Sequence, residues 1–87
     1  MRHEIKCWPQ YFQRVVDGTK TFEIRNNDRG YQAEDIVFMH EWDPKTEDYT
    51  GRAVMFSVGY VYPLSEERVI ISICRPQLDT NNLGPEE

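Results

Sequence analysis

The sequence predicts a small α+β domain that is mostly β, with one short N-terminal helix and five or six strands that curl into a partly open barrel. Five segments alternate apolar and polar residues with the period of two that is typical of strands. One early segment has helical spacing instead. No two strands are separated by the helical crossover that parallel neighbours need, so we expect a mostly antiparallel sheet whose helix plugs one end.

The N-terminal segment is expected to form the first strand and then the helix. Residues 3–7 alternate His, Ile and Cys with Glu and Lys, which indicates a strand with one buried face. Pro9 then opens the helix, because the first helical turn does not need the N–H that proline lacks. Gly18 follows in the position that commonly ends a helix. The apolar stripe of this helix consists of Tyr11, Phe12, Val15 and Val16.

The second strand, residues 20–25, is the segment most informative about function. Phe22 and Ile24 are its apolar residues, and their spacing predicts that both point into the core. The opposite face then carries Thr21, Glu23 and Arg25. Such polar groups are costly to bury alone, so this face either forms part of a binding site or pairs its charges with a neighbouring strand. We expect that neighbour to be the first strand.

Three further strands are expected after a polar loop at residues 26–30. Residues 35–42 are apolar on both faces for half their length, which predicts a strand covered on both sides. Residues 43–48 are polar and turn-forming, as in a protruding hairpin loop, and they lead to a long strand at residues 52–62. The last strand is expected at residues 67–74.

Glycine and proline mark the end of the folded domain and a bend inside it. Gly59 lies within the long strand, where a glycine indicates a bend or bulge of the kind that a barrel needs to close. Pro63 ends that strand. After residue 75 the sequence is polar without periodicity, so we expect one domain at residues 1–75 and a flexible tail at residues 76–87.

Composition favours a cytoplasmic protein without a cofactor. No apolar run approaches the length that spans a bilayer, and we find no signal-peptide pattern. Cys7 and Cys74 are expected to be buried strand residues in a reducing compartment. His3, His40 and the cysteines lack the spacing of metal ligands, so no metal is expected. His40 alternates with two aromatic residues and is expected to be a satisfied core or rim histidine.

Charge is distributed unevenly along this chain, whose net charge is −5. Residues 1–29 hold six Lys or Arg and four acids, a net of +2, whereas the remaining four bases and eleven acids give −7. The acidic balance argues against a protein that coats nucleic acid through charge alone. A mildly basic N-terminal third on an acidic body favours a small local site for an anionic or polar ligand.

A longer pattern of spaced residues lies between about residue 3 and residue 74. It consists of His3-Glu4-Ile5-Lys6, Pro9, Tyr11-Phe12, Gly18-Thr19-Lys20-Thr21-Phe22-Glu23-Ile24-Arg25, Asn26, Asp28-Arg29, Asp35-Ile36, Glu41, Asp43-Pro44 and Tyr49-Thr50-Gly51-Arg52. This pattern resembles the DUF3850 family of phage and bacterial proteins, within the ASCH superfamily. The resemblance implies a PUA-like barrel.

The resemblance also implies a nucleic-acid function. The wider ASCH group is associated with RNA binding in a cleft beside a Gly-x-Lys-x-x-x-x-Arg segment, which corresponds here to Gly18, Lys20 and Arg25. Some ASCH proteins hydrolyse the amide of N4-acetylcytidine, and these carry a threonine where this chain has Glu23. Glu34 also stands where the family usually has glycine, a difference that is expected to alter only a turn.

The candidate ligand-binding residues, inferred from the motif and the resemblance together, are Lys6, Trp8, Lys20, Glu23 and Arg25, with Arg29 at the rim. Glu23 can accept from the amino group of a base and Arg25 can donate to a carbonyl or phosphate, or the two can satisfy each other. Lys20 and Lys6 are suited to contact phosphate. Trp8 either stacks on a nucleobase or packs on the helix start as a lid of the core.

The predicted function is binding of RNA or a nucleotide-like ligand in a polar cleft. One alternative is hydrolysis of an acylated nucleobase amide, with Lys20 and Glu23 as an acid–base pair that activates water. That reaction requires a second acid facing Lys20, such as Glu41 or an acid near residues 66–67. The other alternative is a phage effector that binds a host protein, because the acidic surface and the loop at residues 43–50 suit a basic partner.

Overall fold

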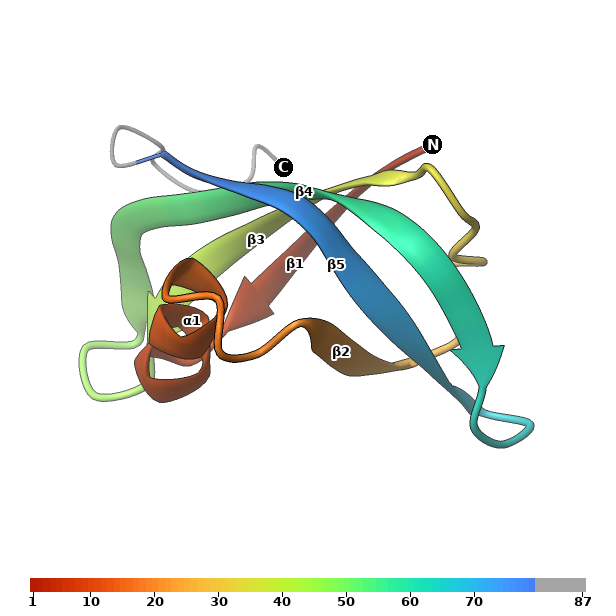
Figure 1. The fold of residues 1–87 in the computed structure, drawn as a ribbon. Helices are drawn as coiled ribbons and strands as arrows, with labels where there is room; N and C mark the ends of the chain where they lie inside the picture. Colours follow the sequence, from red (N-terminus) through yellow and green to blue (C-terminus); the bar gives the residue numbers. More distant parts are fainter. Residues whose placement is uncertain (80–87) are drawn as a thin grey trace.

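The computed structural model describes residues 1–79 and shows a small, mostly β domain with one short helix (Figure 1). Five strands curl into a half-barrel, which confirms the expected fold class. Within these residues no helix is long and apolar enough to cross a membrane. In chain order the elements are β1 (Arg2–Cys7), α1 (Pro9–Val16), β2 (Phe22–Asn26), β3 (Ile36–Asp43), β4 (Asp48–Pro63) and β5 (Arg68–Asp79).

The strands follow the spatial order β1-β3-β4-β5-β2, so the first two strands of the chain form the two edges of the sheet. β3, β4, β5 and β2 pair antiparallel, as expected. β1, however, pairs in parallel with β3 and not with β2, so the expected neighbour of β1 was wrong. We expected no crossover between parallel strands, but the connection from β1 to β3 is one. It consists of α1 and β2, and β2 lies at the opposite edge of the sheet from β1.

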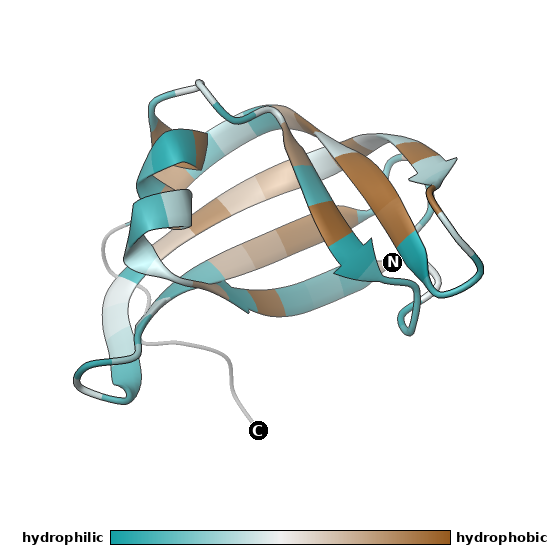
Figure 2. Cartoon of the chain, turned by 90° about the horizontal axis from the view of Figure 1, so that it is seen from below, coloured by the Kyte–Doolittle hydropathy of each residue, from teal (hydrophilic) through white to brown (hydrophobic). Residues whose placement is uncertain are grey.

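Helix α1 lies at one end of the half-barrel and contributes to the centre of its core (Figure 1). Phe12 and Val15 are fully buried, whereas Tyr11, expected in the same apolar stripe, is 52% exposed. Figure 2 shows that the hydrophobic segments lie mainly on the strands, while the connections are mainly hydrophilic. The core cluster also contains Ile5, Cys7, Tyr31, Val37, Met39, Val54, Phe56, Val58, Val69 and Ile71.

Strand β2 faces the opposite way from the expectation. Glu23 points into the molecule and is 4% exposed, whereas Phe22 and Ile24 are 45% and 39% exposed on the outer face. The side chains of β2 therefore alternate between its two faces as predicted, but the prediction of which face is buried was wrong. The physical reason is that β2 is an edge strand beside a polar cleft, and the core next to it is filled by α1 and by Ile71, the partner of Glu23 in β5.

The long strand β4 contains the irregularity expected at Gly59. Its register with β5 shifts between Val58 and Val61. A Cβ atom at Gly59 would lie 2.5 Å from Cys74 Sγ and 2.7 Å from Ser72 Oγ, so a larger residue would have to displace both side chains. The bulge allows β4 to bend as part of the half-barrel.

Strand β5 continues past the domain boundary predicted at residue 75. Residues 77–79 pair with residues 53–55 of β4, so the segment up to residue 79 belongs to the sheet and not to a flexible tail. Backbone pairing needs no apolar side chains, which is why the polar sequence concealed this extension. The rest of the expected tail, residues 80–87, lies outside the described residues.

His40 and the two cysteines occupy buried or half-buried positions. His40 is 1% exposed and its Nε2 atom lies 2.8 Å from Glu4 Oε1, while its Nδ1 atom is buried without a hydrogen-bond partner in residues 1–79. Cys7 is buried, Cys74 is half-buried, and both are free thiols. Burial and the nearby Glu23 carboxylate raise the pKa of Cys7 to about 11, so this thiol stays protonated at neutral pH.

Asp35 is the centre of a polar network between the chain start and β3. It is 5% exposed, and its Oδ2 atom lies 2.8 Å from His3 Nε2. The Met1 ammonium donates to Oδ1 at 3.0 Å, and the Gln32 N–H donates to Oδ2 at 2.9 Å. Burial by itself would raise the pKa of Asp35, but these hydrogen bonds outweigh it and hold the pKa at about 2.

Candidate functional site

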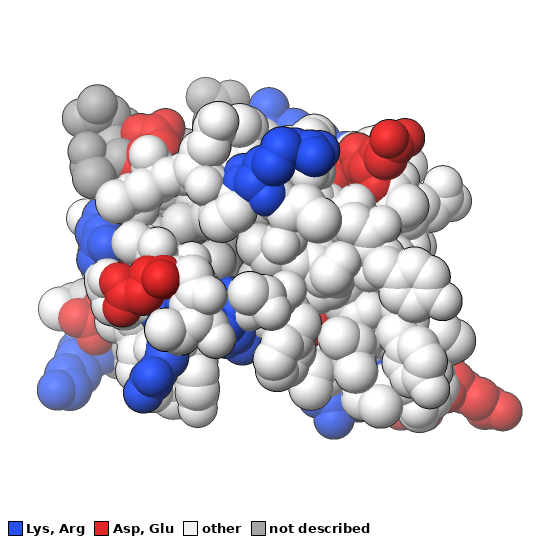
Figure 3. Space-filling view, in the orientation of Figure 1, with Lys and Arg blue, Asp and Glu red and all other residues white. Residues whose placement is uncertain are grey.

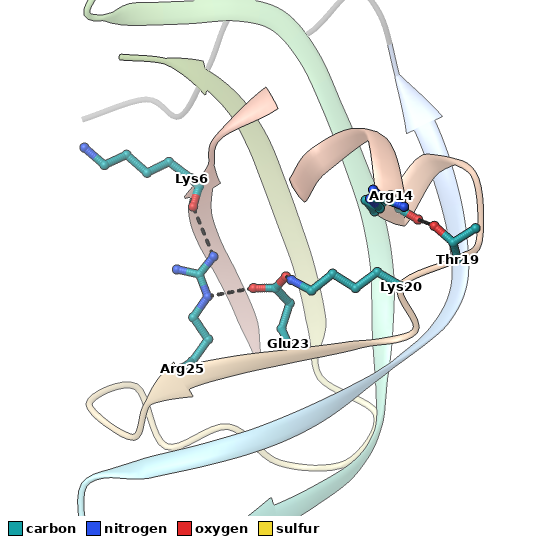
Figure 4. Close-up of polar contacts among 6 residues, drawn as sticks. All are labelled: Lys6, Arg14, Thr19, Lys20, Glu23 and Arg25. Carbon is teal, nitrogen blue, oxygen red and sulfur yellow. Dashed lines mark hydrogen bonds and ion pairs between the residues drawn. The ribbon is translucent and has the colours of Figure 1, made fainter. Parts of the chain in front are cut away.

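The turn after α1 fixes the position of Lys20 at the start of β2. Gly18 adopts a φ of +78°, a left-handed conformation that glycine reaches without strain. The backbone N–H groups of Thr19 and Lys20 both donate to the Arg14 carbonyl at 3.0 Å, and Thr19 Oγ1 donates to it at 3.2 Å (Figure 4). The last turn of the helix therefore anchors the segment that carries Lys20.

Lys20, Glu23 and Arg25 form an ion-pair cluster on the inner face of β2, called here the β2 cluster (Figure 4). Lys20 Nζ contacts Glu23 Oε1, and Arg25 Nε donates to Glu23 Oε2 at 3.2 Å. The Glu23 side chain is 5% exposed, whereas those of Lys20 and Arg25 are 24% and 26% exposed. Burying a carboxylate is costly unless charged partners satisfy it, and these two cations do so for Glu23.

The two edge strands face each other across the open side of the half-barrel, called here the seam. Arg25 Nη2 donates to the Lys6 carbonyl at 3.0 Å, and Arg29 Nη1 donates to the Glu4 carbonyl at 2.6 Å. Both carbonyls belong to the edge of β1 that has no partner strand. The two guanidinium groups therefore satisfy part of an open sheet edge and connect β1 with β2 and the loop after it.

A cleft of about 430 Å³ lies along the seam at the end nearest α1. This volume falls in the range typical of small-molecule sites. The lining of the cleft includes Lys6, Trp8, Tyr11, Lys20, Glu23 and Arg25. A hollow of about 220 Å³ adjoins it, with a lining that includes Lys6, Arg25, Asn26, Arg29 and Tyr31. All six predicted site residues thus line one of two neighbouring spaces.

Trp8 and Lys6 occupy the rim of the cleft in different ways. Trp8 is 47% exposed, so it does not form a buried lid over the helix start. The backbone carbonyl oxygen of Lys6 accepts a hydrogen bond from Arg25. The side-chain ammonium of Lys6 lies over the Trp42 ring, 4.3 Å from the ring centroid. Figure 4 shows the Lys6 side chain directed away from Glu23. In this conformation Lys6 contributes backbone, and not its charge, to the centre of the cleft.

The cleft and the hollow carry an excess of positive charge in a chain that is acidic overall. Together their linings contain four bases, Lys6, Lys20, Arg25 and Arg29, and two acids, Glu23 and Asp28. The Lys6 ammonium lies over Trp42, so three of these bases direct their charge at the site against two acids. In the face of the molecule shown in Figure 3, charged groups of both signs are scattered among uncharged residues without a continuous basic stripe. A small excess of positive charge therefore lies at the seam, and binding of an anionic or polar ligand there stays a prediction.

Tyr11 and Tyr31 also line the site, although neither was among the predicted site residues. The Tyr11 ring centroid lies 5.7 Å from Lys20 Nζ. A signal for Tyr11 existed, because it is the polar-tipped member of an apolar stripe and such residues favour boundaries between core and solvent. Tyr31 is 5% exposed beside the hollow, and burial raises its pKa. No comparable signal marks Tyr31.

Neither a second acid in ion-pair contact with Lys20 nor a cluster of metal ligands occurs within residues 1–79. Glu41, one proposed second acid, accepts a hydrogen bond from Thr50 Oγ1 at 2.6 Å, and an arginine of β4 lies 3.6 Å from its other oxygen. Residues 66–67 lie in the turn between β4 and β5. The carboxylate that contacts Lys20 is Glu23.

Comparison with known proteins assigns the chain to a family. The model of the family described as "Domain of unknown function (DUF3850)" matches residues 2–73. The chain is also similar to the "Uncharacterized 12.9 kDa protein in GpA 3'region" of Escherichia phage P2, with 38% identity over 64 residues. That match covers 74% of this chain and 57% of the phage protein, so the chain spans less than two thirds of this relative. Because the family match includes both edge strands, α1 and the β2 cluster, the chain belongs to the DUF3850 family.

Proposed function

We propose that this protein is a cytoplasmic, PUA-like ASCH domain that binds RNA or a nucleotide-like ligand in the cleft at the seam. The observation that carries the proposal is the buried Glu23 carboxylate, held between Lys20 and Arg25 in an open cleft with exposed aromatic rings at its rim. A nucleotide combines a phosphate, a hydrogen-bonding base edge and an aromatic face. The cleft offers a chemical partner for each of these three features.

Lys20 and Arg25 are the partners for phosphate. Within the described residues, Arg25 uses two of its five N–H groups, one on Glu23 and one on the Lys6 carbonyl. Lys20 uses one of the three N–H groups of its ammonium on Glu23. The remaining donors are available to an anion. Because Glu23 holds both cations in position before a ligand arrives, binding costs less side-chain entropy.

Trp8 and Glu23 are the partners for the base. Trp8 is 47% exposed at the rim, so a nucleobase can stack on its ring. Each oxygen of Glu23 contacts one cation, and a carboxylate has lone pairs for further donors, so the amino group of a base can share these oxygens. Arg29 adds positive charge at the hollow beside the cleft.

The cleft supports binding better than hydrolysis of an acylated base. Hydrolysis would need a second acid facing Lys20, and the carboxylate in ion-pair contact with Lys20 within residues 1–79 is Glu23 itself. Glu41, which the hydrolytic mechanism would use as a second acid, is hydrogen-bonded to Thr50 instead. Binding of a host protein is the other alternative, and the experiment below separates it from ligand binding.

An NMR titration of the isotope-labelled protein at low salt tests the proposal, first with a short single-stranded RNA and then with N4-acetylcytidine. We expect the amide shifts to cluster at the cleft residues. We also expect Lys20→Ala and Arg25→Ala to lose binding while the fold survives, because both side chains are partly exposed. Lys45→Ala removes an exposed lysine in the turn between β3 and β4 and is the matched control with unchanged binding.

The remaining outcomes separate the alternatives. Loss of the acetyl signal during the titration would add hydrolysis to binding. Unchanged affinity in both Lys20→Ala and Arg25→Ala would place the ligand elsewhere and contradict the proposal. Silence with both ligands would also contradict it and would favour a protein partner.

A further inference from the structure

The exposed aromatic residues of the described chain lie along one path that begins in the cleft. Five Phe, Tyr or Trp side chains in residues 1–79 are exposed, with exposed fractions from 45% to 66%. They are Trp8, Tyr11, Phe22, Tyr60 and Tyr62. Soluble domains rarely keep so many large rings in water without a binding role. The strand register shows how these five rings follow one another.

Lys20 connects the aromatic residues of the cleft with those of the outer sheet face. Its Nζ atom lies 5.7 Å from the ring centroid of Tyr11, which lines the cleft, and 6.0 Å from that of Phe22, which is on the outer face of β2. Ile24, the next outward residue of β2, also lines the cleft. Strand β2 therefore forms the border between the cleft and the outer face of the sheet, and it contributes residues to both.

On the outer face six exposed or half-buried residues form two rows across β2, β5 and β4, which are neighbours in the sheet (Figure 1). The rows face outward because the intervening pair, Glu23 and Ile71, is buried. Tyr60 is brought into its row at the bulge of β4, where its N–H donates to Ser72 Oγ at 2.7 Å. The first row consists of Phe22, Ser72 and Tyr60, and the second of Ile24, Ile70 and Tyr62.

This face has the chemistry of a stacking platform. In Figure 3 the surface over β5 and the C-terminal end of β4 is mainly uncharged. Phe22 and Tyr60 lie two strand spacings apart, a distance of roughly 10 Å. Sheet faces that bind single strands present aromatic rings to successive bases, while cations contact the backbone. Here Lys20 is the cation at the point where a strand would pass from the cleft to the face.

We propose that the ligand of the cleft is a single-stranded nucleic acid that continues over β2 onto this outer face, where its bases stack on Phe22, Tyr60 and Tyr62. The inference rests on the proposed function and specifies its ligand class, a strand of several nucleotides in place of a free nucleoside. A protein partner is less well supported, because the aromatic residues form a continuous path with the cleft and Lys20 lies at the junction.

Binding of a mononucleotide and of oligonucleotides of about four to eight nucleotides tests this inference, since such site sizes are usual for small single-strand-binding domains. Fluorescence anisotropy would measure the affinities at low salt. We expect wild-type affinity to rise with length. Tyr60→Ala and Tyr62→Ala should each weaken binding of the longest strand by roughly tenfold. Mononucleotide binding should stay unchanged, because neither residue lines the cleft.

Two control variants separate loss of stacking from other effects. Tyr60→Phe keeps the ring and should bind the long strand like wild type, whereas Lys45→Ala removes an exposed charge outside the cleft lining and should also bind normally. Both tyrosines are more than half exposed, so their substitution removes little core packing, and circular dichroism would verify the fold.

Four results would overturn the inference. Equal affinity for the mononucleotide and the long strand, or wild-type binding of the long strand by both Tyr60→Ala and Tyr62→Ala, would do so while the cleft proposal stands. Absence of binding by every nucleotide would reject both proposals. A dimer in sedimentation that Tyr60→Ala dissociates would assign the outer face to a second copy of the chain and would also overturn the inference.

Discussion

Asp35 and Glu23 are both buried carboxylates, 5% and 4% exposed, but only the partners of Glu23 line the cleft at the seam. Asp35 is bound by the buried His3, by the Met1 ammonium and by the Gln32 N–H. Glu23 is bound by two cations whose side chains are about a quarter exposed and line a cleft. Met1, His3 and Gln32 line neither the cleft nor the hollow, whereas Lys20 and Arg25 present their remaining donors to the cleft.

This difference shows that burial of a charge does not by itself identify a functional site. Structural ion pairs perturb and bury carboxylates as effectively as binding sites do. The informative property is whether the partners of the buried group line a cleft that can hold a ligand. By that criterion Glu23 belongs to the candidate site and Asp35 to the framework that holds β1 against β3.

The largest expected effect on stability comes from removing the framework carboxylate. Asp35→Ala should lower the free energy of unfolding by about 3 kcal/mol, because it leaves buried donors without an acceptor. Urea denaturation monitored by circular dichroism measures this loss. Glu66→Ala makes the same charge change at an exposed position and should leave stability nearly unchanged. Asp35→Ala should also retain ligand affinity, and a loss of stability below about 1 kcal/mol would contradict the framework role.

For Glu23 the same comparison predicts a large loss of ligand affinity and a smaller loss of stability. Glu23→Gln should weaken ligand binding about tenfold or more, because the neutral amide no longer holds both cations, while stability falls by about 1–2 kcal/mol. The matched control is Glu41→Gln, which also neutralises a buried acid but lies outside the cleft lining. Parallel titrations and denaturation curves of the two variants would distinguish these effects. Equal affinities would place Glu23 in the framework with Asp35.

Acid should weaken the framework network selectively. The pKa of Asp35 is about 2 in the folded protein, below its ordinary value of 3.8, so its ionisation favours the folded state. This contribution is present above about pH 4 and is lost as pH falls towards 2. Urea midpoints measured across this range should fall more steeply for wild type than for Asp35→Asn. Identical slopes for the two proteins would show that another group dominates acid unfolding.

The smallest expected effect is a gain of stability in the turn that leads to Asp35. Glu34 has a φ of +72°, a strained conformation for a residue with a Cβ atom. Glu34→Gly should therefore raise the free energy of unfolding by up to about 1 kcal/mol, part of the strain relief being offset by the greater freedom of glycine in the unfolded chain. Glu34→Ala removes the same side chain but keeps the strain, so it should show no such gain in urea denaturation.

Much of the local structure could be predicted from sequence because its causes are local. Pro9 and Gly18 delimit α1, since one lacks an N–H that the first turn does not need and the other adopts a positive φ. Gly59 marks the bulge of β4, where two side chains leave no space for a Cβ atom. The end of β5 was missed, because backbone pairing with β4 extends through a polar segment.

The candidate site was predicted in its residues but not in its geometry. The Gly18, Lys20 and Arg25 pattern identified the segment, and the structure brings Lys20 and Arg25 together around Glu23. The prediction assumed that β1 and β2 pair, whereas they meet across the seam through arginine side chains. No local rule specifies such a contact between two sheet edges.

The sequence by itself determined the number and type of the elements, the ends of α1 and the position of the bulge, because periodicity, glycine and proline act within a few residues. Only the tertiary structure decided the strand order and the face of β2 that is buried. A period of two is the same whichever face turns inward, so the choice depends on what fills the core and what pairs with the charges. Phe12, Val15 and Ile71 fill that core, and Lys20 and Arg25 satisfy Glu23, so Phe22 and Ile24 remain outside.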